Sequence, residues 1–512
     1  MIFSKTIEEV KKIISALSLS KKDIPLLVVG FMASFLSRGV LLFSLGYNTD
    51  DFSMMLGPTR NGYLLVSYGR WGIAIVHKGL AMLGVEANYG TPFLVFFSFI
   101  ALAYCGVLLC KMWGIQDKLV LSSVVILLFI VHPYQSGIYT YSLAIVTVGL
   151  ALLFTFVPLY VLTIRKSKII IGLSAILFCF ALSIYQITIN YALVVVLVLV
   201  LLTFLRTVKK GQKTISALKY AFKKSSVHFF VLILGTALYG CISWIIIKVL
   251  AILPYSRSQI LSFSPEELFK RATQIANLFY EILFVHEAIN PGTLKYIALF
   301  VLMGSIVAVA VNSCRGKVTS FVVYLALLVS VFLSVIGISL ALKIWFFEPR
   351  LYAAIGLAWA AVVVSGYLSF RSVFARKVFI ALSVVVIIGF ISIDNHIFID
   401  RIRMNSFDRA LSNRIVAALE QNPNSDKVER IVILGEYEHQ QPVQSSFALD
   451  SFSKGYAKVH LLNEFTGYSF LKPNEADSEK ANQACLKVSK WPNPESTMIF
   501  DDLGVVCLSE VE

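Results

Sequence analysis

The sequence has few charged residues and lacks the motifs of several common enzyme classes. Only 15% of its 512 residues are Asp, Glu, Lys or Arg, whereas soluble domains carry about a quarter. No Gly-x-x-x-x-Gly-Lys loop is present, which argues against ATP-driven transport, and no CxxC or HExxH spacing indicates a metal site. No Gly-x-Ser-x-Gly elbow supports a serine hydrolase, although a Ser-His-Asp arrangement of other spacing stays open.

Apolar residues make up 57% of the chain and occur in long runs. A helix needs roughly 20 mostly apolar residues to cross a membrane, and such runs recur from Ile24 to about Asp394. They predict a polytopic α-helical membrane protein with eleven spans, near 24–46, 92–112, 119–134, 141–164, 168–185, 190–206, 227–252, 296–313, 318–345, 351–370 and 377–394. The short run at 71–84 contains His77 and Lys78, so we interpret it as an interfacial helix.

Residues 1–23 carry five lysines and no short apolar core followed by a small-residue cleavage site. They predict a cytoplasmic amphipathic helix on the membrane surface and no removable signal peptide. Its lysines would bind anionic lipid heads, so the net charge of +15 requires no nucleic-acid partner.

The distribution of Lys and Arg predicts the orientation, because these residues concentrate in cytoplasmic loops. With eleven spans and the N-terminus inside, the inner segments hold 22 Lys and Arg and the outer loops hold 9. This arrangement predicts a membrane domain at residues 24–394, with outer loops at 47–91 and 253–295. It places residues 395–512 on the outer side of the membrane.

The segment 395–512 predicts a small α/β domain, with "SFDRALSNRIVAALEQ" as a helix and "VERIVILG" as a buried strand. It contains two cysteines, Cys485 and Cys507, and an oxidising compartment would favour their pairing. We expect the stretch between them to fold as two strands that bring them close. A disulfide and two free thiols both stay open.

The first outer loop begins with adjacent carboxylates, Asp50 and Asp51, which must lie at or beyond the lipid boundary because Asp costs about 2.5–3.5 kcal/mol at the bilayer centre. One interpretation is a helix cap, since Asn48, Thr49 and Asp50 are all good N-cap residues for the short helix "DFSMML". The other is a general base or a metal site in a pocket at the outer face.

Cations and aromatic residues gather in the same outer loops. The first loop is rich in aromatic residues, and the second forms an amphipathic helix that includes Glu281 and His286 near its end. Arg350, in a short late loop, fits a phosphate ligand or a snorkelling anchor equally well. Arg38 lies midway along the first span, where ionisable residues are usually paired or functional; the sequence does not identify its partner.

This layout, together with the stretches "YNTDDF", "NGYLLVSYGRWG", "HPYQSGIYTYSLA" and "SIYQITIN", resembles the GT-C class of membrane glycosyltransferases. Within that class the chain looks like the phage-encoded O-antigen glucosyltransferases that convert bacterial serotype.

The resemblance implies a bacterial inner-membrane enzyme that moves glucose from undecaprenyl-phosphate-glucose to a sugar of the lipopolysaccharide O-antigen at the periplasmic face. It assigns the acidic pair to activation of the acceptor hydroxyl and Arg350 to the donor phosphate. The remaining pocket candidates are Tyr47, Arg70, Tyr139, Tyr141, Tyr185, Gln186, Glu281 and His286. A flippase and the enzyme that makes the lipid donor are its expected partners.

The chemistry agrees with this assignment. A carboxylate can take the proton of a sugar hydroxyl as the new bond forms, and inversion at the anomeric carbon needs no covalent intermediate. A fixed arginine or a divalent cation, Mg²⁺ or Mn²⁺, would stabilise the departing phosphate, although the acidic pair alone is an incomplete metal site. The alternatives are a flippase or transporter of lipid-linked sugars and an O-antigen polymerase.

Overall fold

The computed structural model is mostly helical and divides into two compact units. It describes residues 13–44, 46–54, 64–85, 91–252, 264–285, 292–345, 348–437, 452 and 455–509. The helical unit comprises Met1–Phe43, Gly62–Tyr139 and Ala144–Asn395, and the mixed unit comprises Ser44–Asn61, Thr140–Leu143 and His396–Glu512. We describe each by itself.

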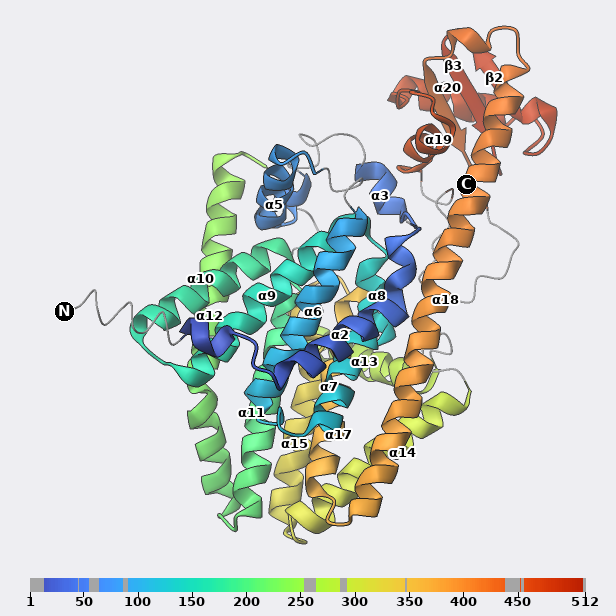
Figure 1. Cartoon of the computed structure of the whole chain (residues 1–512). Coiled ribbons are helices and arrows are strands. Elements are labelled where there is room, and N and C mark those ends of the chain that lie inside the picture. The colour runs from blue at the N-terminus through green and yellow to red at the C-terminus, as the bar shows by residue number, and fades with distance from the viewer. Residues whose placement is uncertain are drawn as a thin grey trace. The chain divides into compact units, whose positions relative to one another are not determined.

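The helical unit is a bundle in which α11, α15 and α17 lie side by side (Figure 1). Its elements are α2 (Asp23–Arg38), η1 (Gly39–Leu42), α5 (Trp71–Met82), α6 (Thr91–Trp113), α7 (Leu119–Val131), α8 (Pro133–Tyr139), α9 (Ser142–Ile164), α10 (Lys168–Ile184), α11 (Thr188–Lys209), α12 (Thr214–Val249), α13 (Pro265–Tyr280), η3 (Glu281–Val285), α14 (Thr293–Ala308), η4 (Val309–Ser313), α15 (Val318–Ser334), α16 (Gly337–Ala341), η5 (Pro349–Tyr352), α17 (Ile355–Ser369) and the first part of α18 (Val373–Glu420).

Each of the eleven apolar runs predicted to cross the membrane overlaps a helix, and two of them, 119–134 and 318–345, are each divided between two α-helices. Eight helices in the described part of the chain are long and apolar enough to span a membrane, which indicates a polytopic membrane protein. The pair α7 and α8 adds a ninth candidate if it forms one bent span, and α10 and α15 are apolar but shorter. The count of eleven stays a prediction.

The chain bends by 47° between α7 and α8. His132 has an extended backbone, with ψ of 130°, because the ring of the following Pro133 disfavours the helical conformation in the residue before it. The break places the polar residues of α8 in the interior of the bundle, where every residue from Pro133 to Tyr139 is buried.

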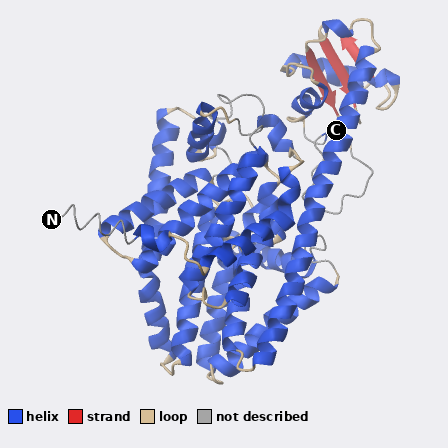
Figure 2. Ribbon diagram, viewed as in Figure 1, coloured by secondary structure: helices blue, strands red, loops and turns tan. Residues whose placement is uncertain are grey.

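The mixed unit packs helices around a three-stranded sheet, drawn in red in Figure 2. Its elements are α3 (Thr49–Met54), the last part of α18, η6 (Ser425–Lys427), β1 (Arg430–Leu434), α19 (Lys458–Thr466), α20 (Glu475–Cys485), η8 (Pro494–Ser496), β2 (Thr497–Phe500) and β3 (Leu503–Cys507). The strand order is β1-β3-β2, with β1 parallel and β2 antiparallel to β3. The predicted helix and strand of this segment correspond to the end of α18 and to β1.

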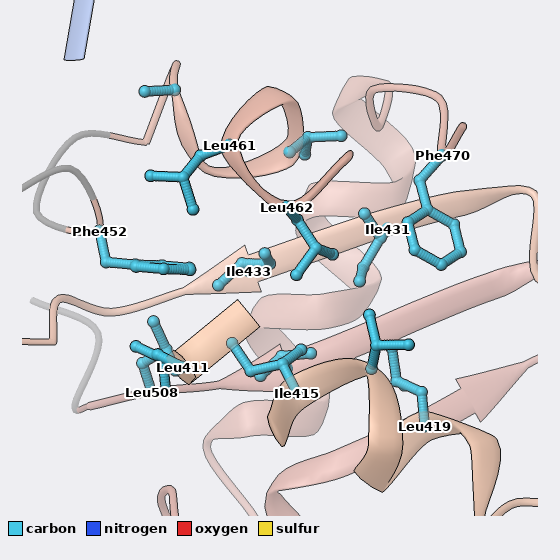
Figure 3. Close-up of a cluster of buried hydrophobic side chains, with 14 of the residues drawn as sticks. Leu411, Ile415, Leu419, Ile431, Ile433, Phe452, Leu461, Leu462, Phe470 and Leu508 are labelled. Atoms are coloured by element: carbon cyan, nitrogen blue, oxygen red, sulfur yellow. The ribbon is translucent and has the colours of Figure 1, made fainter. Parts of the chain in front are cut away.

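One hydrophobic cluster fills the space between α18, β1 and α19 (Figure 3). Leu411, Ile415 and Leu419 recur at a spacing of four residues and so lie on one face of α18. They meet Ile431 and Ile433 of β1 and further apolar residues of α19.

Cys485 and Cys507 form a disulfide with their Cα atoms 5.6 Å apart. The two-strand arrangement expected for this stretch is wrong in part, because Cys485 ends the helix α20 whereas Cys507 ends β3. A capping box explains the helix: the Asn474 side chain accepts a bond from the Asp477 backbone, and the Asp477 side chain accepts one from the Asn474 backbone. Of the predicted N-terminal amphipathic helix, residues 13–17 are helical and residues 1–12 lie outside the described part.

Candidate functional site

The two adjacent carboxylates have different environments. Asn48 is the N-cap of α3: its backbone N–H donates to Asp51 Oδ2 at 2.8 Å, and its side-chain oxygen accepts from the Asp50 N–H at 3.4 Å. Asp51 is therefore the buried acidic member of a capping-box arrangement. Asp50 is half-buried and accepts a hydrogen bond from the Tyr456 hydroxyl through Oδ1, at 2.8 Å.

Phe52 fixes α3 in the core of the mixed unit. Its side chain is fully buried within the cluster formed by α18, β1 and α19. Its ring centroid lies 5.4 Å from that of Phe465 in α19 and 5.7 Å from that of Tyr47. The aromatic residues of "YNTDDF" thus anchor the acidic pair through apolar packing.

A polar face of α18 supports the loop before α3. Arg401, Asn405 and Asp408 follow one another at spacings of four and three residues, which places them on one side of the helix. Asn405 binds both backbone groups of Tyr47: its Oδ1 accepts from the N–H at 2.6 Å, and its Nδ2 donates to the carbonyl at 3.1 Å. This two-point contact fixes the loop just ahead of the acidic pair.

Arg401 places a buried positive charge among the carboxylates of this unit. Its side chain is 1% exposed, and Asp51, Asp408 and Asp50 all attract its charge. Gly46 makes room for it, since a Cβ at that position would lie 2.4 Å from Arg401 Cγ. A buried guanidinium is stable only with such partners, and here it offsets part of their mutual repulsion.

A second polar group lies in the helical unit around Arg70. Arg70 Nε donates to Gln186 Oε1 at 3.1 Å, and its guanidinium lies 5.1 Å from the centre of the Tyr185 ring. Burial lowers the pKa of Arg70, and the positive charge of Arg350 lowers it further, against the opposing effect of Tyr185. Two guanidinium groups that repel each other in a partly desolvated site form a natural binding place for an anion such as phosphate.

The motif "YGRWG" explains how Arg70 is positioned. Gln186 Nε2 donates to the Tyr68 carbonyl at 2.7 Å and to the Tyr239 hydroxyl at 3.0 Å. Gly69 has a φ of +74°, and a Cβ there would lie 2.5 Å from the Tyr239 hydroxyl. Only glycine adopts this turn without strain so close to a neighbour.

The motif "SIYQITIN" also supports the turn that carries Arg350. Asn190 Nδ2 donates to the carbonyl of Leu351 at 3.0 Å, and the rings of Tyr134 in α8 and Tyr352 in η5 lie 6.1 Å apart. The motifs "YGRWG" and "SIYQITIN" therefore position Arg70 and Arg350, which both belong to the helical unit.

The structure identifies the partner of Arg38. Its Nη2 lies 3.5 Å from Asp394 Oδ2, and both side chains are fully buried. Ser136 of α8 joins them, because it accepts from Arg38 Nε at 3.0 Å and donates to Asp394 Oδ1 at 2.7 Å. The guanidinium also lies 4.7 Å from the centre of the Tyr139 ring. The pair therefore links α2, α8 and α18.

The predicted pocket residues separate into distinct groups. Tyr47 and Tyr141 lie in the mixed unit, where Tyr141 acts electrostatically on Arg401. Tyr139 is buried beside Arg38, and its hydroxyl is 2.6 Å from Ser98 Oγ. Glu281 is the first residue of η3, and its charge interacts electrostatically with the Tyr352 phenol. His286 lies outside the described residues.

Several residues of these groups were not predicted from the sequence: Arg401, Asn405, Asp408, Tyr456, Tyr239 and Asp394. The first three carry a usable signal, namely a polar stripe at helical spacing directly after an apolar run. Among the residues that the structure describes, no three His, Cys, Asp or Glu side chains converge as a metal site would require.

The apolar helices and the buried polar groups define a polytopic helical protein of the membrane. A comparison of the sequence with family models identifies the particular family. The chain belongs to the family described as Glucosyl transferase GtrII, whose model matches residues 39–388. The chain is thus a member of a glucosyltransferase family, as its motifs indicated, and the match includes the acidic pair, Arg70 and Arg350. No curated relative and no solved structure matches it.

Proposed function

We propose that the protein transfers glucose from undecaprenyl-phosphate-glucose to a sugar of the lipopolysaccharide O-antigen, in one displacement with inversion. The observation that carries the proposal is the difference in burial and hydrogen bonding between the two carboxylates. Asp51 is buried and caps α3, whereas Asp50 is partly exposed on the same turn. Asp50 is therefore the member of the pair that a substrate hydroxyl can reach, and we assign it as the general base.

The leaving group of this reaction is a lipid phosphate, which gains negative charge as the glycosidic bond breaks. Arg70 and Arg350 supply fixed positive charge in the helical unit, and Gln186 and Asn190 hold the segments that carry them. Such prepositioned cations stabilise a developing charge with little reorganisation. We assign both arginines to the donor phosphate.

We further propose that the chain lies in the bacterial inner membrane with its N-terminus in the cytoplasm and residues 395–512 in the periplasm. The support is the excess of Lys and Arg in the segments predicted to face inward. A reporter that is active only outside the cytoplasm should be active when fused after Asp394; an inactive fusion would refute this orientation.

The catalytic assignment can be tested with Asp50→Asn and Asp51→Asn, in membranes supplied with polyprenyl-phosphate-glucose and O-antigen acceptor. Loss of a general base typically costs roughly 100-fold or more, so Asp50→Asn should lose at least that factor. Asp51→Asn keeps a side-chain acceptor for the cap and should lose less. Asp117→Asn is the control, because Asp117 is exposed and bonds only Lys22 among the contacts that the structure gives it.

Normal transfer by both variants of the pair would refute the proposed mechanism. A large loss confined to Asp51→Asn would assign the base to Asp51 instead. Separately, Arg70→Gln and Arg350→Gln should each raise the donor KM, and an unchanged donor KM in both would remove the arginines from the phosphate site.

A transporter of lipid-linked sugars is a second candidate, favoured by the fully buried pair of Arg38 and Asp394 within apolar helices. A transporter would move the lipid-linked sugar without forming a glucosylated acceptor. Detection of labelled glucose in the acceptor, absent with Asp50→Asn, would decide for the transferase.

A further inference from the structure

Tyr456 brings an exposed aromatic ring to the acidic pair. It lies just before α19 in the mixed unit, 48% exposed, with its hydroxyl 2.8 Å from Asp50 Oδ1. Its backbone is fixed, because Ala457 is fully buried and the Tyr456 carbonyl accepts a hydrogen bond from Lys472 Nζ at 3.3 Å. Tyr456 is thus held in place by these contacts while about half of its surface stays exposed.

The position of Tyr456 constrains what can approach Asp50. A hydroxyl that gives its proton to a carboxylate must come within roughly 2.6–3.2 Å of an oxygen. The Tyr456 hydroxyl already occupies one such place on Oδ1. Most hydroxyls of a pyranose are attached directly to its ring, so a sugar that binds Asp50 through Oδ1 would lie beside the Tyr456 side chain.

The chemistry of the side chain suits that ligand. Tyrosine combines a flat apolar body with a polar tip, and a pyranose combines an apolar C–H face with hydroxyl groups around its edge. Tyr456 is 48% exposed while its hydroxyl is engaged with Asp50, so part of this side chain is accessible to a ligand. An aromatic residue with a purely structural role would gain more stability from full burial.

We propose that Tyr456 is a binding residue for the acceptor sugar: its ring stacks on the pyranose, and its hydroxyl orients Asp50 for proton transfer. This inference rests on the proposed function. It also assigns acceptor recognition to a part of the chain beyond residue 388, where the match to the family ends. The acceptor-binding site would then include sequence that the family pattern does not specify.

The test measures initial rates of glucose transfer by the full chain in membranes while the acceptor and donor concentrations are varied in turn. Tyr456→Ala should raise the acceptor KM by about 3- to 10-fold, the range expected for loss of one aromatic stacking contact. The donor KM should not change. Tyr456→Phe keeps the ring, so its acceptor KM should stay within about twofold of the wild type, while kcat falls through the lost hydrogen bond to Asp50.

Tyr468→Ala is a matched control. Tyr468 is another exposed tyrosine of the mixed unit, 41% exposed, but its hydroxyl bonds Glu420 rather than the acidic pair. Tyr456→Leu preserves bulk without an aromatic face and should behave as Tyr456→Ala does. Thermal unfolding curves and the donor KM show whether each variant is folded.

An acceptor KM that is equal in Tyr456→Ala, Tyr468→Ala and the wild type would overturn the inference, as would full recovery by Tyr456→Leu. These outcomes leave the proposed function intact if Asp50→Asn still abolishes transfer. Normal transfer by both Asp50→Asn and Asp51→Asn would instead remove the proposed function itself.

Discussion

The variant Asn405→Ala tests how much the position of the loop before Asp50 contributes to the rate of glucose transfer. Asn405 is 8% exposed and makes two hydrogen bonds to the backbone of Tyr47, of 2.6 and 3.1 Å. Each bond contributes about 0.5–1.5 kcal/mol net, so the attachment of the loop to α18 should weaken by about 1–3 kcal/mol. The Tyr47 N–H and carbonyl would also lose these partners in a half-buried place.

The consequence for the rate follows from the position of the loop, three residues ahead of Asp50. A displacement of about 1 Å in a catalytic group can cost roughly 100-fold, so we expect kcat to fall by about 10- to 100-fold. The donor KM should stay unchanged, because the cationic residues assigned to the phosphate belong to the helical unit.

The assay compares glucose transfer at saturating substrate in purified full-length protein. The neighbouring Ser406→Ala serves as the control, since Ser406 is exposed and its hydroxyl bonds only the preceding turn of α18, at Ile402, among the contacts that the structure gives it. Asn405→Asp provides a second comparison: it keeps the acceptor for the Tyr47 N–H, loses the donor and adds a negative charge. A kcat for Asn405→Ala equal to that of Ser406→Ala would refute the positioning role.

Two further predictions concern buried charges. Gly46→Ala should lower kcat without a change in donor KM, because the new Cβ would lie 2.4 Å from Arg401 Cγ and must displace either the side chain or the loop; unchanged kinetics would show that the loop relaxes freely. Asp394→Asn should lower the thermal stability of the purified protein, since removing one partner of a buried ion pair costs about 3–5 kcal/mol. Combining it with Arg38→Met should recover part of that loss, and a double variant as unstable as the single one would argue against the pair.

The sequence predicted the helical elements well because their signal is local. Each apolar run overlaps a helix, and the short apolar run in "VERIVILG" identified the buried strand β1. Hydrophobicity and helical periodicity depend only on residues near one another along the chain. The break at Pro133 came from equally local stereochemistry, yet it was not predicted, because the run 119–134 read as one continuous span.

The acidic pair was found from the sequence, but its two candidate roles could not be separated there. The structure assigns capping to Asp51, with Asn48 as the N-cap. It gives Asp50 a different partner, Tyr456, from a distant part of the chain. A capping role for one carboxylate therefore does not exclude a role as base for the other, since adjacent residues of a helix point in different directions.

By itself, the sequence determined that the chain is rich in membrane-length helices, that an acidic pair follows the first of them, and that its motifs resemble those of a glucosyltransferase family. Only the tertiary structure decided which residues meet. Arg38 pairs with Asp394, Arg70 with Gln186, and Asp50 with Tyr456. The physical reason is that a buried charge or hydrogen-bonding group must find a partner in space, and that partner depends on how helices pack rather than on the residues beside it in the chain.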